Sequence, residues 1–187
     1  RFLQPSPDDP APPPVLDPYT TIKFSGGPGD DSIDGGRNID RLFGQGGEDI
    51  IDGGYGSDII DAGLGNDLIA VSWGFDIVEG GEDRDVLEGT RDADHFIEKG
   101  TGPGGADLLK FDLPGLNFDT TITFTGIEHV KLLGGVGDNR FTLTNWSGSA
   151  EIFGFFGNDR VIVDNDTDMQ LKDGVGESLT LNSAVAK

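Results

Sequence analysis

Residues 26–97, divided into blocks of nine, read GGPGDDSID, GGRNIDRLF, GQGGEDIID, GGYGSDIID, AGLGNDLIA, VSWGFDIVE, GGEDRDVLE and GTRDADHFI. Position six is Asp in every block, and position eight is apolar in every block. Glycine predominates at positions one, two and four. A fixed period of this kind is typical of repeat architectures, in which each unit buries its apolar face against the next unit.

Each block divides into a six-residue turn followed by a three-residue strand. Glycine lets the turn backbone adopt left-handed dihedral angles, and Asn38, Asp83 and Asp92 replace it at position four. Because side chains alternate across a strand, position eight faces one side while positions seven and nine face the other. Two blocks then make one coil, with two short parallel sheets facing each other across a thin core. The predicted core consists of Ile33, Leu42, Ile51, Ile60, Ile69, Val78, Leu87 and Phe96.

The position-six acids are expected to form two columns, one on each side of the coil. Consecutive members of a column then lie about one strand spacing apart, roughly 4.8 Å. Bare carboxylates at this distance repel each other and take up protons. A divalent cation removes the conflict, and oxygen-only ligands with several glycine carbonyls match Ca²⁺ rather than Mg²⁺ or Zn²⁺. We therefore predict several Ca²⁺ ions held between the turns.

The blocks resemble the RTX, or haemolysin-type, calcium-binding nonapeptide repeat GGxGxDxUx. The resemblance covers residues 26–97, continues in patches to about residue 162 and includes residues 126–130 (GIEHV) ahead of a later unit. It implies an all-β fold, a right-handed parallel β-roll or β-solenoid, with each calcium ion clamped between two turns one coil apart. It also implies secretion from a Gram-negative bacterium through a type I channel, with the chain folding outside the cell.

The family pattern makes position-six carboxylates and turn carbonyls the calcium ligands. Carried onto this sequence, the ligand set is Asp31, Asp40, Asp49, Asp58, Asp67, Asp76, Asp85, Asp94, Asp107, Asp159, Gly26, Gly35, Gly44, Gly53 and Gly80. The best-formed pairs are Asp31/Asp49, Asp49/Asp67 and Asp40/Asp58. Weaker sites are expected around Asp76, whose turn VSWGFD lacks both opening glycines, and around Asp85, where Arg84 can compete for the acidic column. Asp107 and Asp159 lie in good turns without an evident partner eighteen residues away.

Three stretches are predicted along the chain. Residues 1–18 hold seven of the ten prolines and are typical of an extended linker. Residues 19–100 are expected to form the β-roll, with a capping strand over 19–24. Residues 101–187 are interpreted as a degenerate solenoid continuation and cap, with units at 102–110, 134–142 and 154–162. Because the chain begins with Arg1 rather than Met, we expect it to be part of a longer protein.

Composition excludes several classes of partner. The chain has 187 residues and a formal charge of −21, which repels nucleic acid and anionic membranes. It contains no cysteine, so disulfides and thiolate metal sites are excluded, and it has no apolar run long enough for a spanning helix. An acidic, glycine-rich chain fits either disorder or a fold that holds many cations. The repeat favours a combination of the two, in which the chain is disordered without calcium and folds when calcium binds.

No GxSxG, HExxH or P-loop motif occurs, so no enzymatic activity is predicted. His95 is expected to lie on an outward strand position in solvent. Trp146, Phe153, Phe155 and Phe156 either cap the degenerate core or form a platform for a glycan or a protein. Two functions remain open: a structural and folding segment of a secreted protein, or a calcium-dependent adhesion or carbohydrate/protein-binding module.

Overall fold

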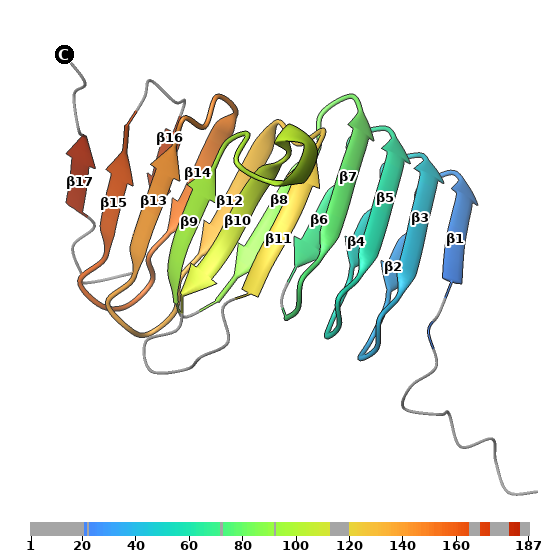
Figure 1. Ribbon diagram of the computed structural model, residues 1–187, viewed down its shortest axis with the longest axis horizontal. Coiled ribbons are helices and arrows are strands. Elements are labelled where there is room, and N and C mark those ends of the chain that lie inside the picture. The colour runs from blue at the N-terminus through green and yellow to red at the C-terminus, as the bar shows by residue number, and fades with distance from the viewer. Residues whose placement is uncertain are drawn as a thin grey trace, which may run out of the picture.

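The structure is a computed structural model that describes residues 21, 23–71, 73–91, 93–112, 120–164, 169–172 and 180–183. The predicted linker over 1–18 and Asp92 lie outside these residues. The described part is all-β apart from one 3₁₀ turn, Pro103–Gly105, and its strands form two sheets that run along the long axis of the molecule (Figure 1). The larger sheet has the order β1 (Lys23–Pro28), β3 (Arg41–Gly46), β5 (Ile59–Leu64), β7 (Ile77–Glu82), β11 (Thr120–Thr125), β10 (Asp107–Asp112), β9 (Asp94–Glu98), β13 (Arg140–Thr144), β15 (Arg160–Val163) and β17 (Thr180–Ser183). The smaller sheet has the order β16 (Met169–Lys172), β14 (Ser149–Phe153), β12 (His129–Leu133), β8 (Val86–Thr90), β6 (Leu68–Val71), β4 (Ile50–Asp52) and β2 (Ser32–Asp34).

The first coils follow the nonapeptide period. Strands that are neighbours in a sheet are parallel, and their paired residues are eighteen positions apart, as Leu42 beside Ile60 and Ile51 beside Ile69. Successive blocks therefore alternate between the two sheets, as the period predicts. The predicted parallel β-solenoid is confirmed.

Position eight supplies the interior of these coils. Seven of the eight predicted core residues are buried, with exposed fractions of at most 4 %: Ile33, Leu42, Ile51, Ile60, Ile69, Val78 and Leu87. The residues on either side of them face outward, because alternate side chains of a strand lie on opposite faces. Position eight gives each strand one aliphatic core residue, Ala62 and Val71 add to the core on β5 and β6, and neighbouring coils share one cluster.

The regular period ends after β8, where three strands enter the larger sheet. β11 pairs with β7 in parallel, β10 runs antiparallel to both β11 and β9, and β9 then pairs in parallel with β13. In the smaller sheet β8 pairs directly with β12. The larger sheet therefore has two extra strands, β10 and β9, between β11 and β13. In the smaller sheet, the corresponding strands β12 and β14 are direct neighbours.

The eighth block contradicts two predictions made from the period. His95 is fully buried, and Phe96 is only half-buried, so the inward and outward positions are exchanged. The cause is a register slip, because His95 rather than Phe96 lies beside Phe141, the position-eight residue of the unit at 134–142. A shift of one residue transfers every side chain of a strand to the other face. The buried His95 ring packs against Phe111 and Phe141, each at a centroid distance of 4.8 Å.

Beyond the interruption, the second half continues the same two sheets. β12, β14 and β16 extend the smaller sheet in parallel, and β13, β15 and β17 extend the larger one. At the other end, β1 forms the first strand of the larger sheet beside β3. β1 covers Lys23–Pro28, which overlaps the end of the strand predicted over 19–24 and runs beyond it; residues 19, 20 and 22 lie outside the described part.

Candidate metal centre

The position-six acids form two stacked columns, as predicted for the first coils. The first column contains Asp31, Asp49, Asp67 and Asp85, and the second contains Asp40, Asp58 and Asp76. In the first column, the backbone N–H of each Asp donates to Oδ1 of the Asp one coil further on, at 2.8–2.9 Å. The second column repeats this contact from Asp40 to Asp58 and from Asp58 to Asp76. Each carboxylate therefore bridges two turns.

The second carboxylate oxygen faces the interior of its turn. Oδ2 of Asp49, Asp58, Asp67 and Asp85 is buried and accepts no hydrogen bond from any described residue. Burying an ionised oxygen without a partner is costly, so each turn contains an acceptor that lacks a counter-charge. Main-chain carbonyls lie next to the oxygens of Asp49 and Asp85. A Cβ added to Gly44 would lie 2.3 Å from Oδ2 of Asp49 and 2.4 Å from the Ala62 carbonyl oxygen, and a Cβ added to Gly80 would meet Oδ2 of Asp85 and the Gly126 carbonyl. Carboxylate and carbonyl oxygens of this kind are ligands that suit Ca²⁺.

The glycines of the turn have two different roles. Glycines at positions two and four adopt positive φ, as Gly27 and Gly29 do, and Asp83 takes over this conformation at position four with φ 82°. Asn38 does not adopt a positive φ, so that part of the prediction is wrong. Glycines at position one do not have positive φ either. At these glycines the carboxylate lies where a Cβ would be: the distance to Oδ2 would be 2.3–3.1 Å at Gly26, Gly35, Gly44, Gly53 and Gly80. Blocks five and six carry Ala62 and Val71 at this position, so a Cβ is accommodated there.

Burial raises the pKa of four column acids, Asp58, Asp67, Asp76 and Asp85. Desolvation raises the pKa of Asp58 and Asp85 to about 6 and that of Asp76 to about 7, and it also raises the pKa of Asp67. The backbone N–H of the previous column member lowers each value, and the neighbouring carboxylate raises it. Ionised columns near neutral pH therefore need positive charge from elsewhere.

Three predicted ligands lie outside the two columns. Asp94 accepts a hydrogen bond from Arg140 N–H at 2.7 Å, and Asp107 accepts one from Gly100 N–H at 2.7 Å. The structure brings neither of them beside another position-six acid. Asp159 does have a counterpart, at a spacing of twenty residues, because Asn139 N–H donates to its Oδ1 at 2.8 Å. The contact is the same as in the columns, with Asn139 in place of an acid.

Sequence reasoning missed Glu128, which continues the first column across the interruption. Asp85 N–H donates to Oε2 of Glu128 at 3.0 Å, and the register of β8 with β12 sets Glu128 beside Asp85. The available signal was its position two residues before the buried Val130, which matches the spacing from position six to position eight. The second column ends differently: Ile122 lies opposite Asp76, and although burial raises the pKa of Asp76, the positive charge of Arg91 offsets part of that rise.

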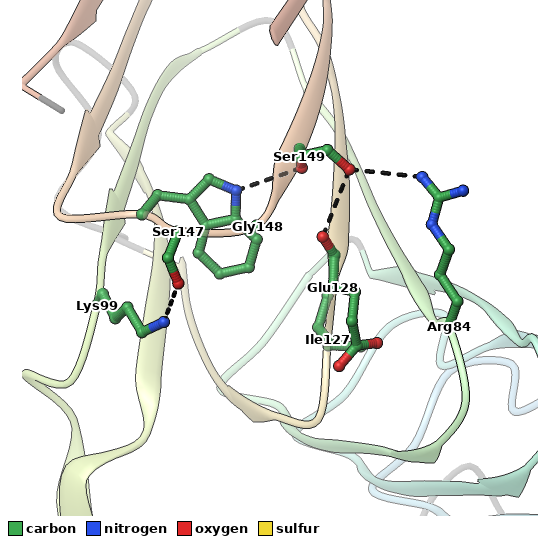
Figure 2. Close-up of a pocket in the computed structure, with 8 residues that line it drawn as sticks. Arg84, Lys99, Ile127, Glu128, Ser147, Gly148 and Ser149 are labelled. Carbon is green, nitrogen blue, oxygen red and sulfur yellow. Dashed lines mark hydrogen bonds between the residues drawn. The ribbon is translucent and has the colours of Figure 1, made fainter. Parts of the chain in front are cut away.

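Glu128 also lines a cavity of about 410 Å³ (Figure 2). The cavity is lined by Arg84, Lys99, Ile127, Glu128, Trp146, Ser147, Gly148 and Ser149. Arg84, which was predicted to compete for the acidic column, donates instead to Oγ of Ser149 at 3.5 Å, and Lys99 donates to Oγ of Ser147. Trp146 is buried, with Nε1 donating to the Ser149 carbonyl at 3.3 Å. Its ring therefore belongs to the core and not to an exposed platform.

The donor set limits what the columns can bind. Among the described residues, no three His, Cys, Asp or Glu side chains gather at one point as a metal cluster. A bound ion would be held by one or two carboxylates together with main-chain carbonyls. Such a donor set fits Ca²⁺, which accepts six to eight oxygens in flexible geometry, and does not fit Zn²⁺.

Comparison with known proteins agrees with this chemistry. The family model of the RTX calcium-binding nonapeptide repeat matches in four copies, over residues 23–42, 34–69 and 72–97. No curated protein is significantly similar to the chain. In the described residues, no helix has the length and apolar character needed to cross a membrane. The repeats between residues 23 and 97 belong to the RTX calcium-binding nonapeptide repeat family, and the chain contains a calcium-binding repeat module folded as a β-solenoid.

Proposed function

We propose that this chain is a calcium-binding segment of a secreted or cell-surface bacterial RTX protein, and that it folds when calcium binds. The observation that carries the proposal is the row of buried Oδ2 oxygens that accept no hydrogen bond from a described residue; those of Asp49, Asp58 and Asp85 lie beside a position-one glycine. An ion placed among these oxygens and the adjacent carbonyls supplies the positive charge that the columns lack. The ligands are the column acids and the turn carbonyls.

Calcium acts as a folding switch in this proposal. Each ion that binds only the native state stabilises it by RT ln(1 + [L]/Kd), so several sites act together. Without the ion, each coil brings carboxylates close together around a thin core of aliphatic side chains. The chain then stays unfolded at the low calcium of the bacterial cytosol, passes a type I channel and folds outside. Its role is structural, and the proposal gives it no catalytic step.

Circular dichroism of the full chain tests the switch. The spectrum is expected to be disordered in excess chelator and rich in β-structure in calcium, with magnesium unable to replace calcium. Asp49→Asn should raise the calcium concentration at the midpoint, because it removes a ligand charge shared by two turns. Asp34→Asn removes the same charge from an exposed strand position and serves as the control. A folded, unchanged spectrum in excess chelator would contradict the proposal.

A second candidate function is an adhesion module that binds a glycan or a protein. Phe155 and Phe156 favour it, because 37 % and 55 % of their surfaces are exposed beside Phe153. Trp146 is no longer part of such a surface. Binding to a glycan array that is lost in a Phe155→Ala/Phe156→Ala variant, in calcium, would favour this function over a purely structural one.

A further inference from the structure

We propose that the first column ends in a calcium site outside the repeats, formed by Asp85, Glu128 and the carbonyl of Gly126. The inference rests on the proposed calcium-binding function and extends it to residues that no nonapeptide contains. It makes Glu128 the fifth carboxylate of the column. The site joins the regular coils to the second half of the molecule.

Glu128 makes the same contact as the column acids. Asp85 N–H donates to its Oε2 at 3.0 Å, as Asp67 N–H donates to Oδ1 of Asp85 at 2.9 Å. The pairing of Val86 with His129 sets Glu128 one strand spacing from Asp85. The side chain thus occupies the place of the next position-six acid, although 43 residues separate it from Asp85 in sequence.

The turn before Glu128 is a shortened form of the nonapeptide turn. Pairing of β7 with β11 sets Gly126 beside Gly80, so Gly126 is the position-one residue of the next coil. Position six follows position one by five residues in the repeats, as Asp85 follows Gly80, whereas Glu128 follows Gly126 by two. The glutamate side chain is one methylene longer than aspartate. This extra length lets a shorter turn present a carboxylate at the same level.

Two further oxygens converge at this point. A Cβ added to Gly80 would lie 2.6 Å from Oδ2 of Asp85 and 1.9 Å from the Gly126 carbonyl oxygen. The same pair of oxygens surrounds Gly44, where the distances are 2.3 Å to Oδ2 of Asp49 and 2.4 Å to the Ala62 carbonyl. Asp85 is fully buried, and its Oδ2 accepts no hydrogen bond from a described residue. A buried, unpartnered acceptor therefore points into the site.

No side chain of the described residues neutralises Glu128. The ion pairs in this part of the chain join Lys110 to Glu98 and Lys131 to Glu88. The guanidinium of Arg84 reaches Ser149, and the Glu128 carboxylate points away from the Ser149 hydroxyl (Figure 2). Glu128 is exposed and lines the cavity of about 410 Å³, which gives an ion and its waters access to the site.

The second column provides an internal contrast. The residue opposite Asp76 is Ile122, which is fully buried and has no oxygen in its side chain. There, Arg91 contributes the positive charge near Asp76. The structure therefore offers a terminal calcium site on the first column alone.

Calcium titration of the full chain by isothermal calorimetry tests the site. Glu128→Gln should lose one bound Ca²⁺ per chain, or raise the Kd of one site by roughly tenfold or more, because ligand charge tunes calcium affinity. The amide oxygen of Gln can still accept from Asp85 N–H, so the fold is expected to persist. Glu82→Gln removes the same charge from an exposed residue of the Asp85 turn and should leave the number of bound ions unchanged.

The outcomes separate this inference from the proposed function. If Glu128→Gln binds as many ions with the same affinities as Glu82→Gln, the terminal site is disproved while calcium binding by the repeats stands. If the unmodified chain binds no calcium, both fail. Should the variant not fold, an anomalous difference map of calcium-loaded crystals of the unmodified chain decides, since the site requires a peak between Asp85 and Glu128.

Discussion

At the scale of single residues, the repeat is maintained by two separate steric requirements on glycine. The glycines at positions two and four adopt a positive φ, as do Gln45 and Asp83, although Asn38 at position four does not. The position-one glycines have an ordinary φ but lie against the position-six carboxylate, where a Cβ would crowd Oδ2; Ala62 and Val71 occupy this position in the fifth and sixth blocks. The position-one glycine is therefore tied to the metal centre more closely than its neighbours are.

Gly44→Ala tests this distinction. The new methyl group would lie 2.3 Å from Oδ2 of Asp49 and 2.4 Å from a main-chain carbonyl, so one of them must move. We expect a loss of about 1–3 kcal/mol in unfolding free energy in calcium, as for other overpacked sites, together with weaker calcium binding. Gly46→Ala in the same turn is the control, because its nearest contact would be an ordinary 3.7 Å. Equal effects of the two changes, in urea unfolding and calcium titration, would contradict the steric role.

At the scale of the elements, the two carboxylate columns share one geometry and end in different chemistry. The first column continues to the carboxylate of Glu128. The second column ends at Asp76, which lies opposite Ile122 and near Arg91. Burial raises the pKa of Asp58, Asp67, Asp76 and Asp85, and it lowers the pKa of His95 to about 3. A fall in pH therefore stabilises the fold through the column acids and destabilises it through His95.

The calcium-free chain should gain β-structure as the pH falls from 8 to 5. A carboxyl whose native pKa is raised stabilises the fold below its unfolded value and loses this contribution as the pH rises through 6 to 7. His95 acts in the opposite direction, because its contribution is lost as the pH falls below its ordinary value of 6.5. The four column acids outweigh one histidine in this range.

Circular dichroism at a series of pH values, in chelator-treated buffer, measures the effect. Asp76→Asn should reduce the gain between pH 7 and 6, since Asp76 has the highest column pKa, about 7. Saturating calcium should abolish the gain, because bound ions keep the carboxylates ionised. A β signal that decreases on acidification without calcium would refute the assignment.

At the scale of the whole molecule, the interruption formed by β9, β10 and β11 joins two solenoid segments that share one core. Phe124 of β11 and Trp146, which precedes β14, meet there at a ring centroid distance of 5.9 Å. The buried residues of both halves form one continuous hydrophobic cluster. The second half is therefore packed on the repeats rather than separated from them.

Trp146→Ala measures how much this junction contributes to stability. Removing a fully buried tryptophan should cost about 3–5 kcal/mol of unfolding free energy. Phe156→Ala removes an aromatic ring of the same half whose surface is 55 % exposed, and should stay within about 0.5 kcal/mol. Urea unfolding in saturating calcium gives both values, and equal midpoints for the two variants would show that Trp146 does not support the junction.

The nonapeptide period alone was sufficient to predict the fold class, the eighteen-residue coil, seven core residues and the stacking of the column acids from Asp31 to Asp85 and from Asp40 to Asp76. These features depend on local repetition, in which each coil places the next one in the same register. Three features could be identified only from the tertiary structure. The His95 side chain is buried, strands β9 to β11 are inserted in the larger sheet, and Glu128 continues the first column. The burial of His95, the pairing of β11 with β7 and the position of Glu128 arise from pairings across 43 and 46 residues. Their register depends on how the sheets close over the interruption and not on the nine-residue spacing along the chain.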